Sequence, residues 1–357
     1  MKTIEDKINL TAAEILAIPE KSPEKLFSGE LEIAKSEYHT LCRRWHPDYN
    51  TDANATAIFQ HVNNLYRAAQ QLIETNCWRG AGVLELPGAG SGAAAVSRRI
   101  RYFKRADFEL GEMYIGETEI AFAVERQYAD LFENASRRIA SFQFANLSMQ
   151  KEMHGNLPDN PEYFATAERL ILVLPKAPDM ILLEDLLEHL GGAVDARHVA
   201  WIGSSLQNLA CYFDYAGIVH HDISPQTVFV SPKYHSVMLL GGWWYAGFAG
   251  GKINALPNRT INVAPADVLR NKRADTRVDL ELIRQTGREL LGNGGGAPLK
   301  TNEKIPAAMA RWFNGATSGS AVADYQLWRN VLEMAFGKPR FCRLDVEPGA
   351  IYATSGF

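Results

Sequence analysis

The stretch Trp45-His46-Pro47-Asp48-Tyr49-Asn50 lies between two segments whose apolar residues recur at helical spacing. Upstream these residues are Leu31, Ala34, Tyr38, Leu41 and Trp45, and downstream they are Ile58, Phe59, Val62, Leu65, Tyr66, Ala69 and Leu72. A proline cannot continue a helix, and it disfavours helical backbone at the residue before it. The first helix is therefore predicted to end before Pro47, which places His-Pro-Asp in the exposed loop of an antiparallel helical hairpin.

This hairpin resembles the J-domain, the module through which DnaJ-type co-chaperones activate DnaK-type ATPases. The resemblance rests on the triplet, on the basic residues of the helix before it, and on an earlier segment, 11–18, that matches a first J-domain helix. It implies that a DnaK-type chaperone contacts Lys35, His39, Arg43, Arg44, His46, Pro47 and Asp48. The alternative is an ordinary helical hairpin whose loop happens to read His-Pro-Asp.

The basic face of this predicted domain, residues 1–78, is small. Lys35, His39 and Arg43 are spaced four residues apart, so they share one side of a helix. Residues 1–78 contain eight Lys/Arg against eleven Asp/Glu. The domain therefore has a basic patch, but a thinner one than the resemblance implies.

The whole chain has the composition of a globular cytoplasmic protein. It has 357 residues, of which 46% are hydrophobic and 22% charged, and this length suggests two or three domains. Its net charge of -4 gives no reason to expect binding to nucleic acid, and no apolar run is long enough to cross a membrane. Four cysteines are scattered without metal-type spacing, and the N-terminus lacks the apolar core of a signal peptide.

Residues 79–99 connect this domain to the rest of the chain. They include a glycine-rich run, 80–92, which lacks the Lys-Ser/Thr ending of a phosphate-binding P-loop. We interpret 79–99 as a linker, or as an extra strand formed by Val83 to Leu86. The few remaining residues would then hold the helical domain against the following sheet, with Trp78 as a candidate contact.

From Ile100 onward the pattern predicts an α+β fold. Strands are expected at 98–105, 108–116, 119–124 and 170–174, with helices at 128–144, 199–215 and 324–336. A small antiparallel sheet with one helix, followed by a helical body, is the element order of a protein kinase. The segment 217–230, which contains His220, His221 and Asp222, is similar to a kinase catalytic loop. Ala264-Pro265-Ala266 and Asp279 resemble later kinase motifs.

The resemblance implies a bilobal kinase-like domain over 100–345. Its N-lobe would cover about 100–178 and its C-lobe about 179–345, followed by a loop-like tail at 346–357.

Most of the groups that kinase chemistry needs are missing. Phosphoryl transfer requires a lysine on the phosphates, ligands for magnesium and an aspartate at the substrate hydroxyl. The aspartate is present as Asp222. Ser224 stands where the catalytic loop normally has a lysine, Thr227 stands at the magnesium-binding asparagine position, and Gly242 (or Gly241) stands at the metal-binding aspartate position. Ala123 stands at the position of the lysine that contacts the phosphates. We therefore expect a pseudokinase that uses no cofactor or metal, in which Asp222 caps local backbone N–H groups.

Other residues in this region have structural or functional interpretations. His220 and His221 are adjacent, so their side chains diverge and do not form a metal pair. Trp243 and Trp244 either fill the core or stack a nucleobase. The loop 241–255 is rich in glycine and aromatic residues, which is typical of a mobile lid or a partner surface.

Three functions are compatible with these features. The first is a co-chaperone adaptor that engages a DnaK-type chaperone and delivers a protein client bound by the kinase-like domain. The second is an atypical kinase, which the retained Asp222 supports. The third is an interaction factor of a phage or mobile element that has repurposed a J-domain, which the thin basic patch supports.

Overall fold

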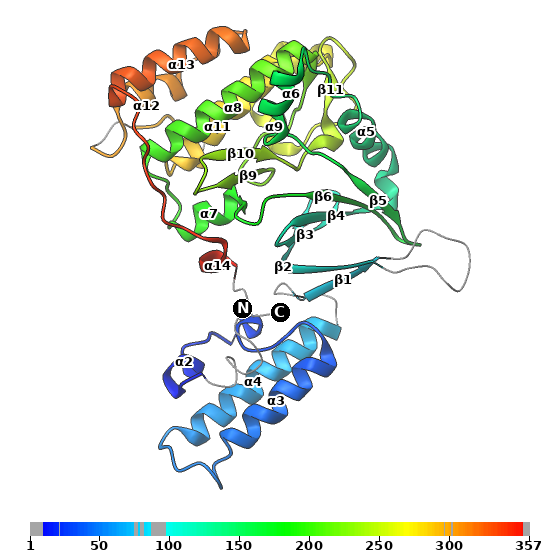
Figure 1. The fold of residues 1–357 in the computed structure, drawn as a ribbon, viewed down its shortest axis with the longest axis vertical. Coiled ribbons are helices and arrows are strands. Elements are labelled where there is room, and N and C mark those ends of the chain that lie inside the picture. The colour runs from blue at the N-terminus through cyan, green and yellow to red at the C-terminus, as the bar shows by residue number, and fades with distance from the viewer. Residues whose placement is uncertain are drawn as a thin grey trace. The chain divides into compact units, whose positions relative to one another are not determined.

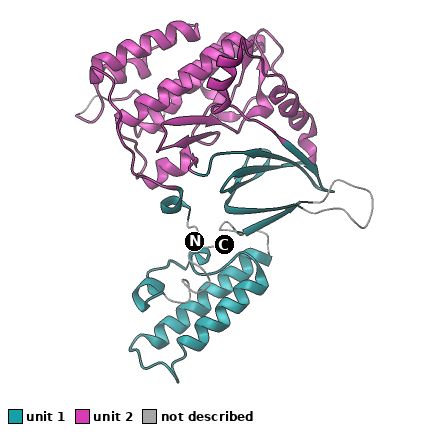
Figure 2. Cartoon of the chain, in the orientation of Figure 1, with its two compact units in different colours: residues 1–125, 162–178, 348–357 teal, residues 126–161, 179–347 magenta. Residues whose placement is uncertain are grey.

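The computed structural model describes residues 10–20, 22–74, 78, 82–86, 98–295, 297–300 and 303–352, and the fold is α+β (Figure 1). The chain forms two compact units (Figure 2): one comprises 1–125, 162–178 and 348–357, the other 126–161 and 179–347. The chain therefore passes from one unit to the other four times. Residues 126–161, assigned to the N-lobe from sequence, belong to the second unit.

The first unit begins with a helical domain. It contains α2 (Ala12–Leu16), the 3₁₀ helix η1 (Pro23–Lys25), α3 (Leu31–Arg44) and α4 (Ala55–Glu74). Thr11 and Glu14 form a capping box that starts α2. The predicted apolar stripes face inward and form a core that includes Ile15, Phe27, Leu41, Ile58 and Leu65. Trp78, which the sequence offered as a contact to the sheet, packs into this helical core and is 3% exposed.

The rest of the first unit is a six-stranded antiparallel sheet with the order β1-β2-β3-β4-β6-β5. The strands are β1 (Gly82–Leu86), β2 (Arg98–Phe108), β3 (Gly111–Gly116), β4 (Glu119–Glu125), β5 (Glu162–Ala165) and β6 (Arg169–Pro175). The extra strand expected at 83–86 is β1, which pairs with β2. The single strand predicted over 108–116 is instead a hairpin, because Phe108 pairs with Gly111 across a two-residue turn. Residues 87–97 of the predicted linker lie outside the described residues.

This sheet curls so strongly that its two ends approach each other. Arg98 at the start of β2 forms ion pairs with Glu119 on β4 and with Glu162 on β5, although β2 and β5 are four positions apart in the sheet. Adjacent strands lie about 4.8 Å apart, so a flat sheet could not bring these residues together. The inner face is filled by one apolar cluster: Leu84, Leu86, Ile100, Tyr102, Tyr114, Ala121, Ala123, Phe164, Ile171 and Val173.

The second unit is mostly helical. Its helices are η2 (Arg126–Tyr128), α5 (Ala129–Ile139), α6 (Leu147–His154), α7 (Leu183–His189), α8 (Ala196–Ala216), η3 (Trp243–Tyr245), α9 (Asn258–Val263), α10 (Ala266–Asn271), α11 (Arg277–Leu290), α12 (Ala307–Asn314) and α13 (Ala321–Phe336). Its short strands are β7 (Ile181–Leu182), β8 (Ile218–Val219), β9 (Val228–Ser231), β10 (Ser236–Leu239) and β11 (Gly247–Phe248). The helix expected over 128–144 ends at Ile139, and the Asn146 side chain caps the separate helix α6. No helix within the described ranges is long and apolar enough to cross a membrane.

The C-terminal tail contains a helix that the sequence analysis did not predict. Residues 346–352 were expected to be loop-like, but α14 (Pro348–Ile351) forms there, with proline at its first position, where the missing N–H has no helical partner. Tyr352 follows, is 4% exposed and stacks on Phe103 of β2 at 6.2 Å. Burial of this aromatic ring holds the short helix, whose sequence alone is too short to predict. Residues 353–357 lie outside the described residues.

Candidate functional site

The His-Pro-Asp loop is a compact turn with its own hydrogen bonds. The N–H groups of Tyr49 and Asn50 donate to the His46 carbonyl at 3.0 and 2.8 Å. The Asn50 side chain donates to the Arg44 carbonyl at 2.9 Å and accepts from the Asp52 N–H at 2.9 Å. These bonds satisfy backbone groups at the end of α3 and define the shape of the loop.

Within this loop, the triplet is presented to solvent. The His46 ring contacts the rings of Tyr49 and Phe59, both at 5.4 Å, and its Nδ1 accepts from the Asp48 N–H at 3.2 Å. The Asp48 side chain is 76% exposed, and Pro47 is exposed as well. A partner can therefore reach the triplet without rearranging the hairpin.

The predicted basic residues lie on the outer side of the same hairpin. Lys35, His39, Arg43 and Arg44 are all exposed. The opposite side of α3 is fixed in the core: Glu37 is 2% exposed and accepts from the backbone and hydroxyl of Ser28, both at 2.7 Å. The Tyr38 ring stacks on Tyr66 at 4.1 Å, and burial raises the pKa of Tyr38 to about 12. The contacts of Glu37 and Tyr38 therefore fix the orientation of α3, which leaves the basic residues at the surface.

In the second unit, the 217–230 loop is anchored by Asp279 at the start of α11. The two carboxylate oxygens of Asp279 accept from the N–H groups of His220 at 2.7 Å and His221 at 2.8 Å. His221 has a φ of +67°, an uncommon value outside glycine, which directs both N–H groups at the same carboxylate. Burial raises the pKa of Asp279 to about 7, although the two N–H donors favour its charged form. Asp279 therefore sets the shape of this loop.

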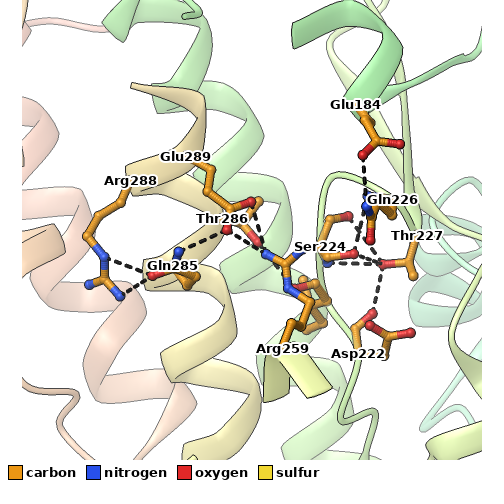
Figure 3. A network of polar contacts seen from close by, with 11 residues as sticks. Glu184, Asp222, Ser224, Gln226, Thr227, Arg259, Gln285, Thr286, Arg288 and Glu289 are labelled. Carbon is orange, nitrogen blue, oxygen red and sulfur yellow. Dashed lines mark hydrogen bonds and ion pairs between the residues drawn. The ribbon is translucent and has the colours of Figure 1, made fainter. Parts of the chain in front are cut away.

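The polar residues of the loop are bonded mainly to one another (Figure 3). The Thr227 hydroxyl donates to the Asp222 carbonyl at 2.7 Å and accepts from the Ser224 N–H at 3.0 Å. The Thr286 hydroxyl of α11 donates to the Ile223 carbonyl at 3.2 Å. The hydroxyl of Thr227 is therefore bonded to backbone groups and has a structural role. The kinase resemblance places a metal ligand at this position.

The two glycines that follow β10 lie directly against this loop. A Cβ atom at Gly242 would lie 2.7 Å from His220 Cε1 and 2.8 Å from both Cβ and Oδ2 of Asp222, and its φ is +81°. A Cβ at Gly241 would lie 3.1 Å from Thr227 Cα. The space in which a metal-binding aspartate side chain would start is therefore filled by the loop itself, most completely at Gly242.

Aromatic residues pack around His220. Trp243 is fully buried, lies 4.6 Å from the His220 ring and donates its Nε1–H to the Leu239 carbonyl at 3.0 Å. Trp244 is also buried, so the interpretation of both tryptophans as core residues is confirmed. Burial lowers the pKa of His220 to about 3, which keeps the imidazole neutral. Among the described residues, no group of three His, Cys, Asp or Glu side chains is arranged to hold a metal ion.

Ala123, at the predicted lysine position, faces the closed interior of the curled sheet. It is 3% exposed and pairs in register with Glu112 and Ile171. Beside it, Arg105 forms a buried ion pair with Glu112, which also accepts from the Tyr114 hydroxyl at 2.8 Å. The sequence analysis missed this charged group, although the alternation of basic and apolar residues over 98–105 was the available signal.

Gly111 and Gly116, the first and last residues of β3, have sheet-packing roles. A Cβ at Gly111 would lie 2.1 Å from the Ala123 carbonyl oxygen, and one at Gly116 would lie 2.7 Å from that of Arg101. Both positions need glycine because neighbouring backbones approach closely. The turn between β2 and β3 is only two residues long.

The 241–255 loop is hydrogen-bonded along both sides. Phe248 of β11 pairs with Ile218 of β8, the Gly250 N–H donates to the Ala274 carbonyl at 2.7 Å, and the Ile253 N–H donates to the Lys272 carbonyl at 2.9 Å. These bonds argue against the mobile lid that the sequence suggested. The other interpretation, a partner surface, is compatible with them.

No protein-family model matches the chain, and no curated protein matches it either, so the assignments that follow rest on the residues and geometry described above.

Proposed function

We propose that this protein is a co-chaperone adaptor whose N-terminal helical domain acts as a J-domain on a DnaK-type chaperone. The observation that carries the proposal is the His46-Pro47-Asp48 triplet, which lies in a hydrogen-bonded turn and is exposed between α3 and α4. The exposed basic residues of α3 lie on the helix that leads into it. A loop fixed by its own hydrogen bonds loses little entropy when a partner docks on it.

The proposal also holds that the kinase-like part is a pseudokinase that binds a client and transfers no phosphate. Three observations support this part. Thr227 donates its hydroxyl to backbone, Gly242 is closed against Asp222, and Ala123 lies in the interior of the curled sheet. A triphosphate with magnesium would find neither the cation nor the ligands that phosphoryl transfer requires. ATP hydrolysis would then occur on the chaperone and not on this chain.

The test is the ATPase rate of a DnaK-type chaperone in the presence of the purified full-length protein. We expect the wild type to raise that rate and His46→Gln to leave it at the unstimulated level. His46 is partly exposed, so the substitution should change the free energy of unfolding by less than about 1 kcal/mol. A melting curve of each protein checks this point.

The matched control is His154→Gln, which removes an exposed histidine of the second unit. It should stimulate the chaperone as well as the wild type does. Equal stimulation by wild type and His46→Gln, or none by either, would contradict the adaptor proposal. The second result would favour the alternative of a hairpin repurposed for another interaction.

A further inference from the structure

Four exposed basic residues of the second unit come together on two chain segments. Lys252 follows β11, and Arg270, Lys272 and Arg273 lie at and just beyond the end of α10. The segments meet in an isolated antiparallel bridge that places Lys252 opposite Arg273. We call these four residues the basic platform.

The fold places these charges together at some energetic cost. Like charges directly opposite each other in an antiparallel pair are destabilising, and Lys252 and Arg273 are paired in this way. Within the described part of the chain, Lys252, Arg270 and Lys272 form no ion pair, while Arg273 donates only to the Gly250 carbonyl at 3.0 Å. An arrangement that concentrates unneutralised charge points to an external anionic partner.

A cavity of about 480 Å³ adjoins the platform and gives a partner room to dock. Arg273 lines this cavity, together with Asp214, Asp267, Asp275 and Arg277. Arg277 pairs with Asp267 at 2.6 Å and with Asp275 at 2.8 Å, so its one positive charge offsets only one of these two carboxylates. With Asp214, the cavity lining holds three carboxylates, against five basic residues when the four of the platform and Arg277 are counted together, so the region as a whole is basic by two charges.

We propose that the basic platform binds an acidic, extended segment of a partner protein. Charge complementarity supports this occupant. The chain as a whole has a net charge of -4 and therefore does not attract anions in general, so the attraction would come from this local cluster of cations. None of the residues lining the cavity is aromatic, whereas proteins that bind single-stranded nucleic acid stack the bases on aromatic side chains. The inference goes beyond the proposed co-chaperone function, since it names the partner's chemistry and does not depend on a chaperone.

The test is fluorescence anisotropy with the full-length protein and a labelled peptide of alternating glutamate and serine. The variant Lys252→Gln/Arg270→Gln/Lys272→Asn removes three platform charges, and asparagine tolerates the left-handed backbone at position 272. Arg273 is not substituted, because its side chain donates to the Gly250 carbonyl. The control variant Lys151→Gln/Arg311→Gln/Arg329→Gln removes three exposed charges elsewhere in the second unit.

We expect the wild type and the control variant to bind the peptide alike, and the platform variant to bind it about tenfold more weakly, with a shallower dependence on salt. His46→Gln should bind as the wild type does, so a failed chaperone assay leaves this inference intact. Equal binding by platform and control variants would overturn it. Tighter binding of a single-stranded 12-nucleotide DNA than of the peptide, lost in the platform variant, would also overturn it in favour of a nucleic-acid surface.

Discussion

Gly242→Ala should lower the free energy of unfolding of the second unit through two contributions, one from the backbone conformation and one from steric overlap. The φ of +81° at this position disfavours any residue with a Cβ atom by roughly 1–2 kcal/mol. The added methyl group would also lie 2.7–2.8 Å from atoms of His220 and Asp222, both buried. Overpacking of this kind typically costs about 1–3 kcal/mol, so the total loss should be about 2–5 kcal/mol.

Gly250→Ala is the matched control, because Gly250 has a φ of +75° but no atom within 4 Å of its added Cβ. Only the backbone cost, roughly 1–2 kcal/mol, applies there. The difference between the two variants, measured by denaturant unfolding or as melting temperatures, isolates the steric contribution. If Gly242→Ala were no less stable than Gly250→Ala, the space beside Asp222 would be open, and the argument that no metal-binding side chain fits there would fail.

Three further predictions concern buried charge, pH and nucleotide. Asp324→Ala should cost about 3–5 kcal/mol because it leaves Arg284, 2.9 Å away and 2% exposed, as an unpaired buried charge. Glu85→Ala, which breaks the exposed pair with Arg99, should cost less than about 1 kcal/mol, and urea unfolding of both variants makes the comparison. The pKa of Asp279 is raised to about 7 in the folded protein, against about 3.9 in the unfolded chain. Between pH 7 and pH 3.9 the folded state therefore binds a proton that the unfolded state does not, and the free energy of unfolding rises as the pH falls through this range. The melting deficit of Asp279→Asn relative to wild type should therefore be larger at pH 5 than at pH 8, and a smaller deficit at pH 5 would mean that the two N–H donors outweigh burial. Magnesium-ATP should leave the melting temperature of the full chain unchanged, whereas a rise of several degrees would mean that a nucleotide site exists, since ligand at 100 times its dissociation constant adds about 2.7 kcal/mol.

Local patterns predicted much of the secondary structure. The helices on either side of Pro47 follow from their apolar periodicity, and α8 and β6 lie within a few residues of their predicted ranges. Such elements are predictable because the spacing of apolar residues along a continuous segment differs between helices and strands. The exposed triplet also followed from the sequence, because a proline beyond the first turn cannot continue a helix.

Contacts between residues far apart in the sequence were not predictable in this way. The curl of the sheet brings Arg98 to Glu162, and the loop geometry depends on Asp279 meeting the N–H groups of His220 and His221. A single sequence does not indicate which distant carboxylate will accept a hydrogen bond from a given N–H group or pair with a given arginine. For the same reason, the sequence showed that metal ligands are missing, but only the structure showed that the space at Gly242 is occupied.

The four passages of the chain between the two units have a consequence for its synthesis on the ribosome. The helical domain, whose described residues end at Trp78, is one continuous stretch and can fold as soon as it emerges. The sheet must wait for β6, which ends at Pro175, and by then α5 and α6 have emerged without the partners that follow Asp179. Helix α5 cannot reach its final contacts until residues 243–245 of η3 are made, since the Asn134 side chain donates to the Trp244 carbonyl. The nascent chain therefore exposes apolar helix faces for longer than a protein with contiguous domains would, and single-cut truncations can isolate neither unit intact.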